Sequence, residues 1–217
     1  MSEGKKKILN LYAGIGGNRK LWGDEYEVTA VEYDNEIASI YSDNFTNDTV
    51  IVTDAHQYLL DHYKEFDFIW SSPPCQTHTQ LMRTNVARWN YGAYPDMQLY
   101  QQIIWLTHFF NGKFCVENVK SYYEPLIKPQ YIGKHYLWAN YKIPDIEIGH
   151  RGHDRKGGSI SALTEIKGFD LSKYKQKGKR QLLRNCTEPI LGLHILNCAM
   201  GDFNKNFEQQ TLFGNEM

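Results

Sequence analysis

The chain has 217 residues, a formal net charge of −1, 41% hydrophobic residues and 23% charged residues. This length allows a substantial buried core, and this composition excludes a disordered chain. No apolar stretch approaches the roughly 18 residues that a membrane span needs, and segment 1–7 lacks the apolar region of a secretory leader.

Short apolar runs typical of β-strands alternate with helical patterns through the first half of the chain. The predicted strands are residues 8–12, 28–31, 50–53, 66–70 and 113–116, and the predicted helices are 35–45, 55–63 and 97–109. This alternation predicts an α/β fold, with a mostly parallel sheet and helices on both of its faces. Ligands of such sheets bind at the carboxyl ends of the strands.

Five polar or reactive side chains fall at or just past the ends of predicted strands. They are Tyr12, Glu32, Asp54, Cys75 and Glu117, and we expect them to line one rim of the sheet. A glycine-rich turn follows the first strand, and Glu32 comes at about the sequence distance at which an acid binds the ribose of an adenosine cofactor. Asp54 is placed to accept a hydrogen bond from an adenine amino group, although its position alone favours a helix cap.

Two prolines directly precede Cys75, and a polar run at 76–80 follows it. A buried cysteine usually acts as a small hydrophobic residue, and this is what we expect of Cys115, Cys186 and Cys198. Cys75 differs, because the prolines stiffen the chain before it and the polar run after it is unsuited to a core. A cysteine and a glutamate, Glu117, at the ends of two strands suit covalent attack on a ring that is protonated at the same time.

The four cysteines lie far apart, with no paired spacing between them. This distribution predicts reduced thiols in a cytoplasm, and it disfavours both a disulfide framework and a zinc site. We therefore expect no metal cofactor.

Four motifs occur along the chain, at 10–17 (NLYAGIGG), 31–34 (VEYD), 73–76 (PPCQ) and 117–119 (ENV). In this order and at this spacing they resemble the DNA cytosine-5 methyltransferase family, and most of all its short members encoded by phages and prophages. The resemblance covers residues 7–141, with a weaker motif at 184–187. It implies a Rossmann-like S-adenosylmethionine-dependent methyltransferase fold, DNA methylation of the kind used in restriction-modification, and the cytoplasm of a bacterium or phage-infected host cell.

The resemblance also implies catalytic roles. Cys75 adds to carbon 6 of a cytosine flipped out of double-stranded DNA, Glu117 hydrogen-bonds or protonates ring nitrogen 3, and carbon 5 then takes the methyl group of S-adenosylmethionine. Lys134 stands for a family arginine that contacts the flipped base. Asn10 replaces an acidic residue of the family, which implies a changed hydrogen bond behind the site rather than changed catalysis.

A larger set of residues is implied in binding the cofactor, with Glu32 on the ribose and Asp54 on the adenine. The set consists of Tyr12, Ala13, Gly14, Ile15, Gly17, Glu32, Tyr33, Asp54, Ala55, Pro74, Asn185 and Cys186.

We expect four parts along the chain: a catalytic and cofactor-binding core (1–141), a short basic DNA-recognition segment (142–183), a part that returns to the core (184–204) and a flexible tail (205–217). Local basic charge can neutralise phosphates even in a neutral protein, and the alternative is a solvated surface. The predicted DNA contacts are Gln76, Arg83, Arg151, Arg155, Lys156, Lys175, Lys177 and Lys179.

Two other functions stay open, namely cytosine-5 methylation of RNA and DNA binding without catalysis by the same fold. Intact Cys75 and Glu117 disfavour the non-catalytic alternative. In the tail, Gln209, Leu212 and Phe213 resemble a peptide that bacterial replication proteins insert into a sliding clamp. The equal alternative is that Leu212 and Phe213 pack on the core.

Overall fold

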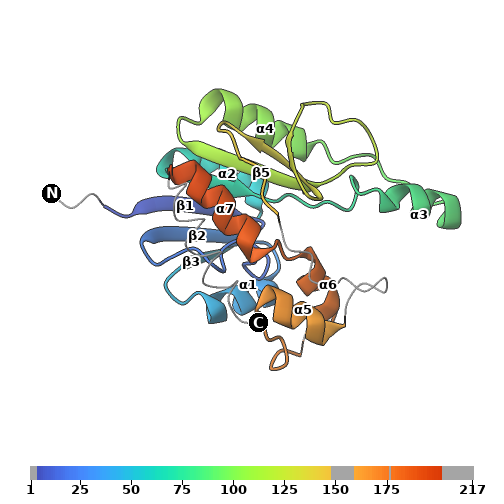
Figure 1. Ribbon diagram of the computed structural model, residues 1–217, viewed down its shortest axis with the longest axis horizontal. Helices are drawn as coiled ribbons and strands as arrows, with labels where there is room; N and C mark the ends of the chain where they lie inside the picture. Colours follow the sequence, from blue (N-terminus) through green and yellow to red (C-terminus); the bar gives the residue numbers. More distant parts are fainter. Residues whose placement is uncertain (1–3, 148–158, 176, 202–217) are drawn as a thin grey trace.

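The computed structural model describes residues 4–147, 159–175 and 177–201 (Figure 1). Within them, one seven-stranded sheet has the strand order β3-β2-β1-β4-β5-β7-β6. The strands are β1 (Lys6–Leu11), β2 (Tyr26–Glu32), β3 (Thr49–Val52), β4 (Phe68–Ser71), β5 (Lys113–Val119), β6 (Gln130–Ile132) and β7 (His135–Ala139). Strands β1 to β5 pair in parallel, whereas β7 runs antiparallel to both β5 and β6. The predicted mostly parallel sheet is confirmed.

The helices are α1 (Asn35–Asn44), α2 (Ala55–His62), the 3-10 helix η1 (Tyr63–Glu65), α3 (Leu81–Trp89), α4 (Gln98–Phe109), α5 (Ile160–Lys167), α6 (Lys179–Asn185) and α7 (Pro189–Met200). One face of the sheet packs against α2 and α4 in a shared apolar cluster. The other face packs against α7, which crosses in front of the sheet in Figure 1, and against α1. Helices therefore cover both faces, as predicted.

Parallel strands covered on both faces consist of consecutive apolar residues, because each face needs them. The four residues of β4 are all buried, and so are the last four of β1. The predicted strands are thus confirmed as β1 to β5, with ends that differ by at most three residues from the predicted ones. Tyr41 and Trp70 are among the largest fully buried side chains.

Helices α5 and α6 form a smaller lobe below the sheet in Figure 1. Its apolar residues, including Leu163, Phe169 and Leu183, pack with Ile40 of α1 and Ile15 of the glycine turn. The α5 and α6 part of the predicted recognition segment therefore packs against the glycine turn. No helix in the described part of the chain is long and apolar enough to cross a membrane.

Candidate active site

The carboxyl ends of the parallel strands form one rim, because their registers place Leu11 beside both Val31 and Ser71, and Ser71 beside Val116. The five side chains predicted for the rim lie at or near these strand ends. Tyr12 follows β1, Glu32 ends β2, Asp54 lies two residues past β3, Cys75 lies four residues past β4, and Glu117 lies near the end of β5. This is the edge at which ligands of such sheets bind.

The glycine turn after β1 folds back onto the end of β2. Tyr12 and Gly14 have positive φ angles of 55° and 56°, and the amide of Gly14 donates to Glu32 Oε2 at 2.9 Å. The other oxygen of Glu32 accepts from the amide of Asp34 at 3.0 Å. A Cβ atom built on Gly14 meets nothing within 4 Å, so open space lies beside a carboxylate held in place by two amides. This arrangement fits the ribose of an adenosine cofactor.

Gly17 and Ile15 support this turn from behind. Ile15 is buried in the apolar cluster of α5 and α6, and a Cβ on Gly17 would clash with the sulfur of Cys186 and with the carbonyl of Thr187. Only glycine fits at this contact. The weaker motif at 184–187 thus contacts the glycine turn through Cys186 and Thr187, while the side chain of Asn185 accepts from Gln181 at 2.6 Å.

The remaining predicted cofactor residues have varied surroundings. Asp54 caps α2 by accepting from the amide of Gln57 at 2.7 Å, which is the helix-cap geometry that its position favours. Ala55 is buried in the first turn of α2, Tyr33 is 78% exposed, and Pro74, directly before Cys75, is exposed. Their contacts with a cofactor stay predictions.

Tyr12 belongs to a buried polar network that the sequence reasoning missed. Gln102 of α4 donates through Nε2 to the Tyr12 hydroxyl at 2.6 Å and accepts through Oε1 from the Ser71 hydroxyl at 2.6 Å. Burial, the largest cause, raises the pKa of Tyr12 to about 12. The sequence did contain a signal, because helical spacing places the amide of Gln102 on the same buried face as the apolar residues Leu99, Ile103 and Leu106. The network fixes the tyrosine that we expect beside the cofactor.

The loop that carries Cys75 is tied to the strand that carries Glu117. Asn118 is buried, and its Nδ2 donates to the Pro73 carbonyl at 2.9 Å. The Cys75 carbonyl accepts the amides of His78 and Thr79, each at 3.0 Å, so a tight turn follows the cysteine. Cysteine and glutamate are thereby held at the ends of adjacent strands.

Burial first, and then the negative charge of Glu117, raise the pKa of the Cys75 thiol. The thiolate is the nucleophilic form of cysteine. The described structure therefore holds Cys75 as a thiol at neutral pH.

The side chain that reaches Glu117 is that of His135, one residue beyond the predicted Lys134. His135 Nδ1 lies 2.7 Å from Glu117 Oε1, and Glu117 is 7% exposed. Lys134 is exposed in the turn between β6 and β7. Glu117 pairs with Leu137 across the antiparallel ladder, and His135 is the diagonal neighbour on the same face. Only knowledge of this register would have identified His135 from the sequence.

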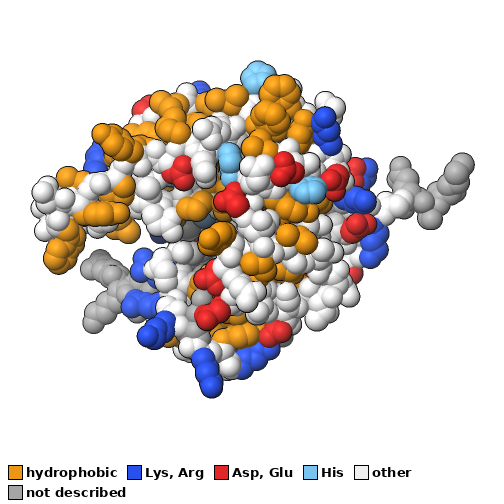
Figure 2. Space-filling view, turned by 180° about the vertical axis from the view of Figure 1, so that it is seen from behind, with side chains coloured by type: hydrophobic (Ala, Val, Ile, Leu, Met, Phe, Trp, Pro, Cys, Tyr) orange, Lys and Arg blue, Asp and Glu red, His pale blue; other side chains and the backbone are white. Residues whose placement is uncertain are grey.

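Figure 2 shows a recess in the surface beside the projecting α3 region, with a group of Lys and Arg side chains below it. Gln76, directly after Cys75, is exposed. Arg83 of α3 donates to the Tyr122 carbonyl at 2.7 Å. Lys179 begins α6. The predicted residues Arg151, Arg155 and Lys156 lie outside the described residues, as do Gln209, Leu212 and Phe213.

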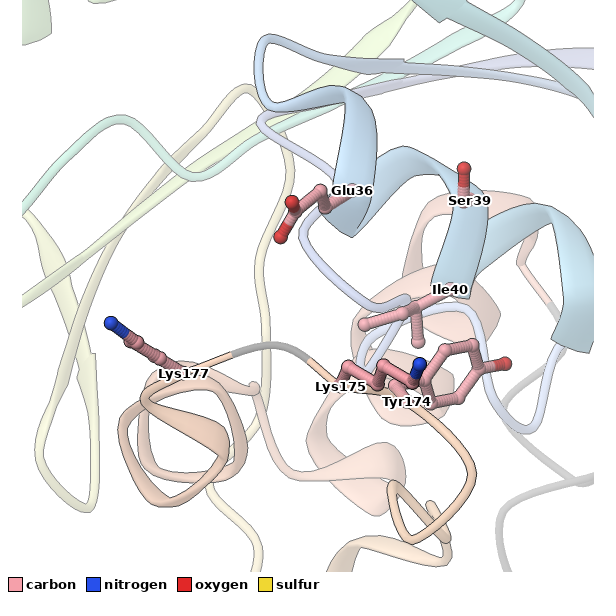
Figure 3. Close-up of a pocket in the computed structure, with 6 residues that line it drawn as sticks. All are labelled: Glu36, Ser39, Ile40, Tyr174, Lys175 and Lys177. Atoms are coloured by element: carbon pink, nitrogen blue, oxygen red, sulfur yellow. The ribbon is translucent and has the colours of Figure 1, made fainter.

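Lys175 and Lys177 line a shallow pocket between α1 and the chain that precedes α6 (Figure 3). Glu36, Ser39, Ile40 and Tyr174 complete its lining. The Tyr174 hydroxyl donates to Asp43 of α1 at 2.8 Å, which holds this basic segment against the core. Among the described residues, no group of three His, Cys, Asp or Glu side chains could hold a metal ion.

The strand order with an antiparallel β7, the glycine turn and the acid at the end of β2 define a Rossmann-like S-adenosylmethionine-dependent methyltransferase. The sequence profile of the C-5 cytosine-specific DNA methylases matches residues 6–125, which is more than half of the chain. The chain therefore belongs to this family, whose members act on cytosine in nucleic acid.

Several solved structures are similar to the chain. DNMT2 from Spodoptera frugiperda is 28% identical over 53% of this chain and 36% of that chain, with a TM-score of 0.38. A hypothetical protein from Thermus thermophilus is 17% identical over 62% of this chain and 74% of that chain, with a TM-score of 0.41. A putative methyltransferase from Escherichia coli is 16% identical over 62% and 74% of the two chains, with a TM-score of 0.37. No curated protein sequence matches the chain significantly.

Proposed function

We propose that the protein methylates carbon 5 of cytosine in double-stranded DNA through a covalent adduct with Cys75. The observation that carries this proposal is the hydrogen bond from Asn118 to the Pro73 carbonyl. It links the loop of a nucleophilic cysteine to the strand of a buried carboxylate, and this pair suits a reaction that needs both on one ring.

In the proposed reaction, the sulfur of Cys75 bonds to carbon 6 of the cytosine and the thiol proton passes to the carboxylate of Glu117. Glu117 hands a proton to ring nitrogen 3, so the electron pair of the broken double bond makes carbon 5 nucleophilic. After carbon 5 has been methylated, it loses its own proton to water, the ring double bond re-forms, Cys75 leaves as the thiolate, and ring nitrogen 3 returns its proton to Glu117. Because the charge of Glu117 raises the pKa of the Cys75 thiol, the thiol keeps its proton until ring nitrogen 3 is in place to receive it through Glu117.

We propose S-adenosylmethionine as the cofactor, which supplies an electrophilic methyl group when bound. The open space beside Gly14, the carboxylate of Glu32 and the hydroxyl of Tyr12 would hold its adenosine part. Glu32 is suited to the ribose because a carboxylate accepts strong hydrogen bonds from hydroxyl groups. Tyr12 is fixed for this contact by Gln102.

The target cytosine has to leave the stack, because carbon 6 is shielded within a duplex. We propose that the duplex lies in the recess between the α3 region and the group of Lys and Arg side chains (Figure 2), and that Arg83, Lys175 and Lys177 contact it. These cations serve mainly phosphates, so binding should weaken steeply with salt. The recognition segment is short, and we expect it to read about two to four base pairs.

The test supplies the full-length protein with radiolabelled S-adenosylmethionine and either duplex DNA or RNA of matched sequence. We expect label in DNA as 5-methylcytosine, and none with a Cys75→Ser variant that still binds the cofactor. Label in RNA alone would overturn the choice of DNA as substrate. Absence of label from both nucleic acids would overturn the activity itself.

We also propose that Gln209, Leu212 and Phe213, outside the described residues, dock on a sliding clamp. A tether of this kind raises the local concentration of a weakly specific enzyme at newly made DNA. Removing residues 209–217 should abolish capture by purified clamp and leave methylation of short duplexes unchanged. Loss of activity on short duplexes would instead show that Leu212 and Phe213 belong to the core.

A further inference from the structure

His135 lies between the buried carboxylate of Glu117 and the partly buried carboxylate of Glu188, and it contacts each with a different ring nitrogen. Its Nδ1 is 2.7 Å from Glu117 Oε1, and its Nε2 is 3.3 Å from Glu188 Oε2. The side chains of Glu117 and His135 are 9% and 18% exposed. A neutral imidazole donates from only one nitrogen, whereas the imidazolium donates from both. Two carboxylates at the two nitrogens therefore select the charged form of His135.

The charge states agree with this geometry. Burial alone lowers the pKa of His135, but hydrogen bonds to Glu117 and Glu188 outweigh it and raise that pKa to about 10. Burial alone raises the pKa of Glu188, but His135 and Lys167 hold it well below its usual value. His135 is therefore a cation at neutral pH.

The chain of ion pairs continues from Glu188 to the lobe of α5 and α6. Lys167 Nζ lies 3.0 Å from Glu188 Oε1, and it also donates to the Cys186 carbonyl at 2.5 Å. Lys167 is the last residue of α5 and is 3% exposed. The charges alternate along Glu117, His135, Glu188 and Lys167, so each buried charge has an opposite neighbour. Such complete pairing is what makes buried charges tolerable.

We propose that His135 and Glu188 are positioning residues for Glu117, and that with Lys167 they join the catalytic carboxylate to the nucleic-acid-binding lobe. His135 fixes one oxygen of Glu117, which leaves the other oxygen to face ring nitrogen 3 of the cytosine. Glu188 holds the imidazolium from its far side, and Lys167 holds Glu188 at the end of α5. The inference rests on the proposed function, since it takes Glu117 as the group that contacts the base.

The first experiment measures kcat, and KM for S-adenosylmethionine, across pH in His135→Gln and Glu188→Gln variants of the full-length protein. Glutamine keeps a hydrogen-bonding amide and removes the charge. We expect kcat to fall roughly 100-fold, as for the loss of proton transfer by a positioned acid, while KM changes less than about twofold.

The pH profile separates a positioning role from a merely structural one. Groups that face His135 are Glu117 and Glu188, with Cys75 near Glu117 and Lys167 beyond Glu188. The wild-type kcat should fall as the pH approaches 10, the value at which His135 loses its charge, and the His135→Gln variant should lack this fall. The matched control is His62→Gln, which removes an exposed pair with Glu65 of 2.8 Å and should keep wild-type kcat. A His135→Gln enzyme with wild-type kcat and pH profile would overturn the proposal.

A second measurement uses only the wild-type protein, so it does not depend on whether a variant folds. In the nitrogen NMR spectrum of the wild-type protein at pH 8, both ring nitrogens of His135 should carry protons, whereas a neutral ring would overturn the proposal. This reading is independent of activity. A protein that transfers no methyl group overturns the proposed function, whereas an active enzyme with a neutral His135 overturns only this inference.

Discussion

Replacing Asn118 with alanine should uncouple the loop that carries Cys75 from the strand that carries Glu117. Asn118 is 2% exposed, donates to the Pro73 carbonyl at 2.9 Å and accepts from the Val119 amide at 2.9 Å. The variant leaves that carbonyl and that amide unpaired, and each unpaired buried group costs about 1–3 kcal/mol. We expect a loss of about 2–4 kcal/mol in the free energy of unfolding, which a domain with roughly 5–15 kcal/mol survives.

The loss of activity should exceed this loss of stability. A displacement of about 1 Å in a reacting group can cost about 100-fold in rate, so kcat should fall by about that factor in protein that remains folded. Urea unfolding gives the stability, and label transfer from S-adenosylmethionine at a temperature far below the melting point gives kcat.

Asn140 provides the matched control at the opposite end of β5. Its side chain accepts from the Phe114 amide at 3.2 Å and donates to the Gly112 carbonyl at 2.8 Å, and it is exposed. Asn140→Ala should cost less stability and leave kcat unchanged. If Asn118→Ala loses stability but keeps wild-type kcat, the asparagine does not position the cysteine and the reasoning is refuted.

Three further changes test the rest of the site. Glu32→Ala should weaken S-adenosylmethionine binding by about 1–3 kcal/mol, and unchanged affinity in isothermal titration would move Glu32 to the purely structural role of holding Gly14. Gly17→Ala should destabilise the protein by about 1–3 kcal/mol through overpacking against Cys186, so an unaltered melting temperature would contradict the packing described. The raised pKa of His135 stabilises the fold fully below pH 6.5, and this contribution is lost as the pH rises to about 10. Over this range the free energy of unfolding should fall by up to about 1.4 kcal/mol per pH unit. If the His135→Gln variant shows the same dependence of unfolding free energy on pH as the wild type, this contribution of His135 is refuted.

The strands and the rim of the site were predictable because their cause is local. Residues of a parallel strand covered on both faces are apolar in sequence, and a polar residue marks the strand end, as at Glu32. Helix α3 was not predicted, because it buries little beyond Met82 and its start at Gln80 has no side-chain cap. Patterns of burial and capping, on which such predictions rest, are weak there.

The partners of Glu117 could not be predicted, because they depend on long-range packing. His135 meets Glu117 through the antiparallel register of β5 and β7. Glu188 comes from the segment that returns to the core, and Lys167 comes from the end of α5. No local pattern encodes a register between strands that are separated in sequence. Lys134, predicted from the family motif, is adjacent to His135 in sequence, but the turn leaves it exposed.

Trapping the covalent intermediate tests the central claim most directly. The full-length protein is incubated with S-adenosylmethionine and duplex DNA in which 5-fluorocytosine replaces the target base, and the products are analysed by intact mass and peptide mapping. Because fluorine cannot leave carbon 5 as a proton does, the account predicts a stable adduct mapped to Cys75 and its absence in Cys75→Ser. An enzyme that methylates normal DNA but forms no adduct, or forms it in the Cys75→Ser variant, would contradict the covalent mechanism.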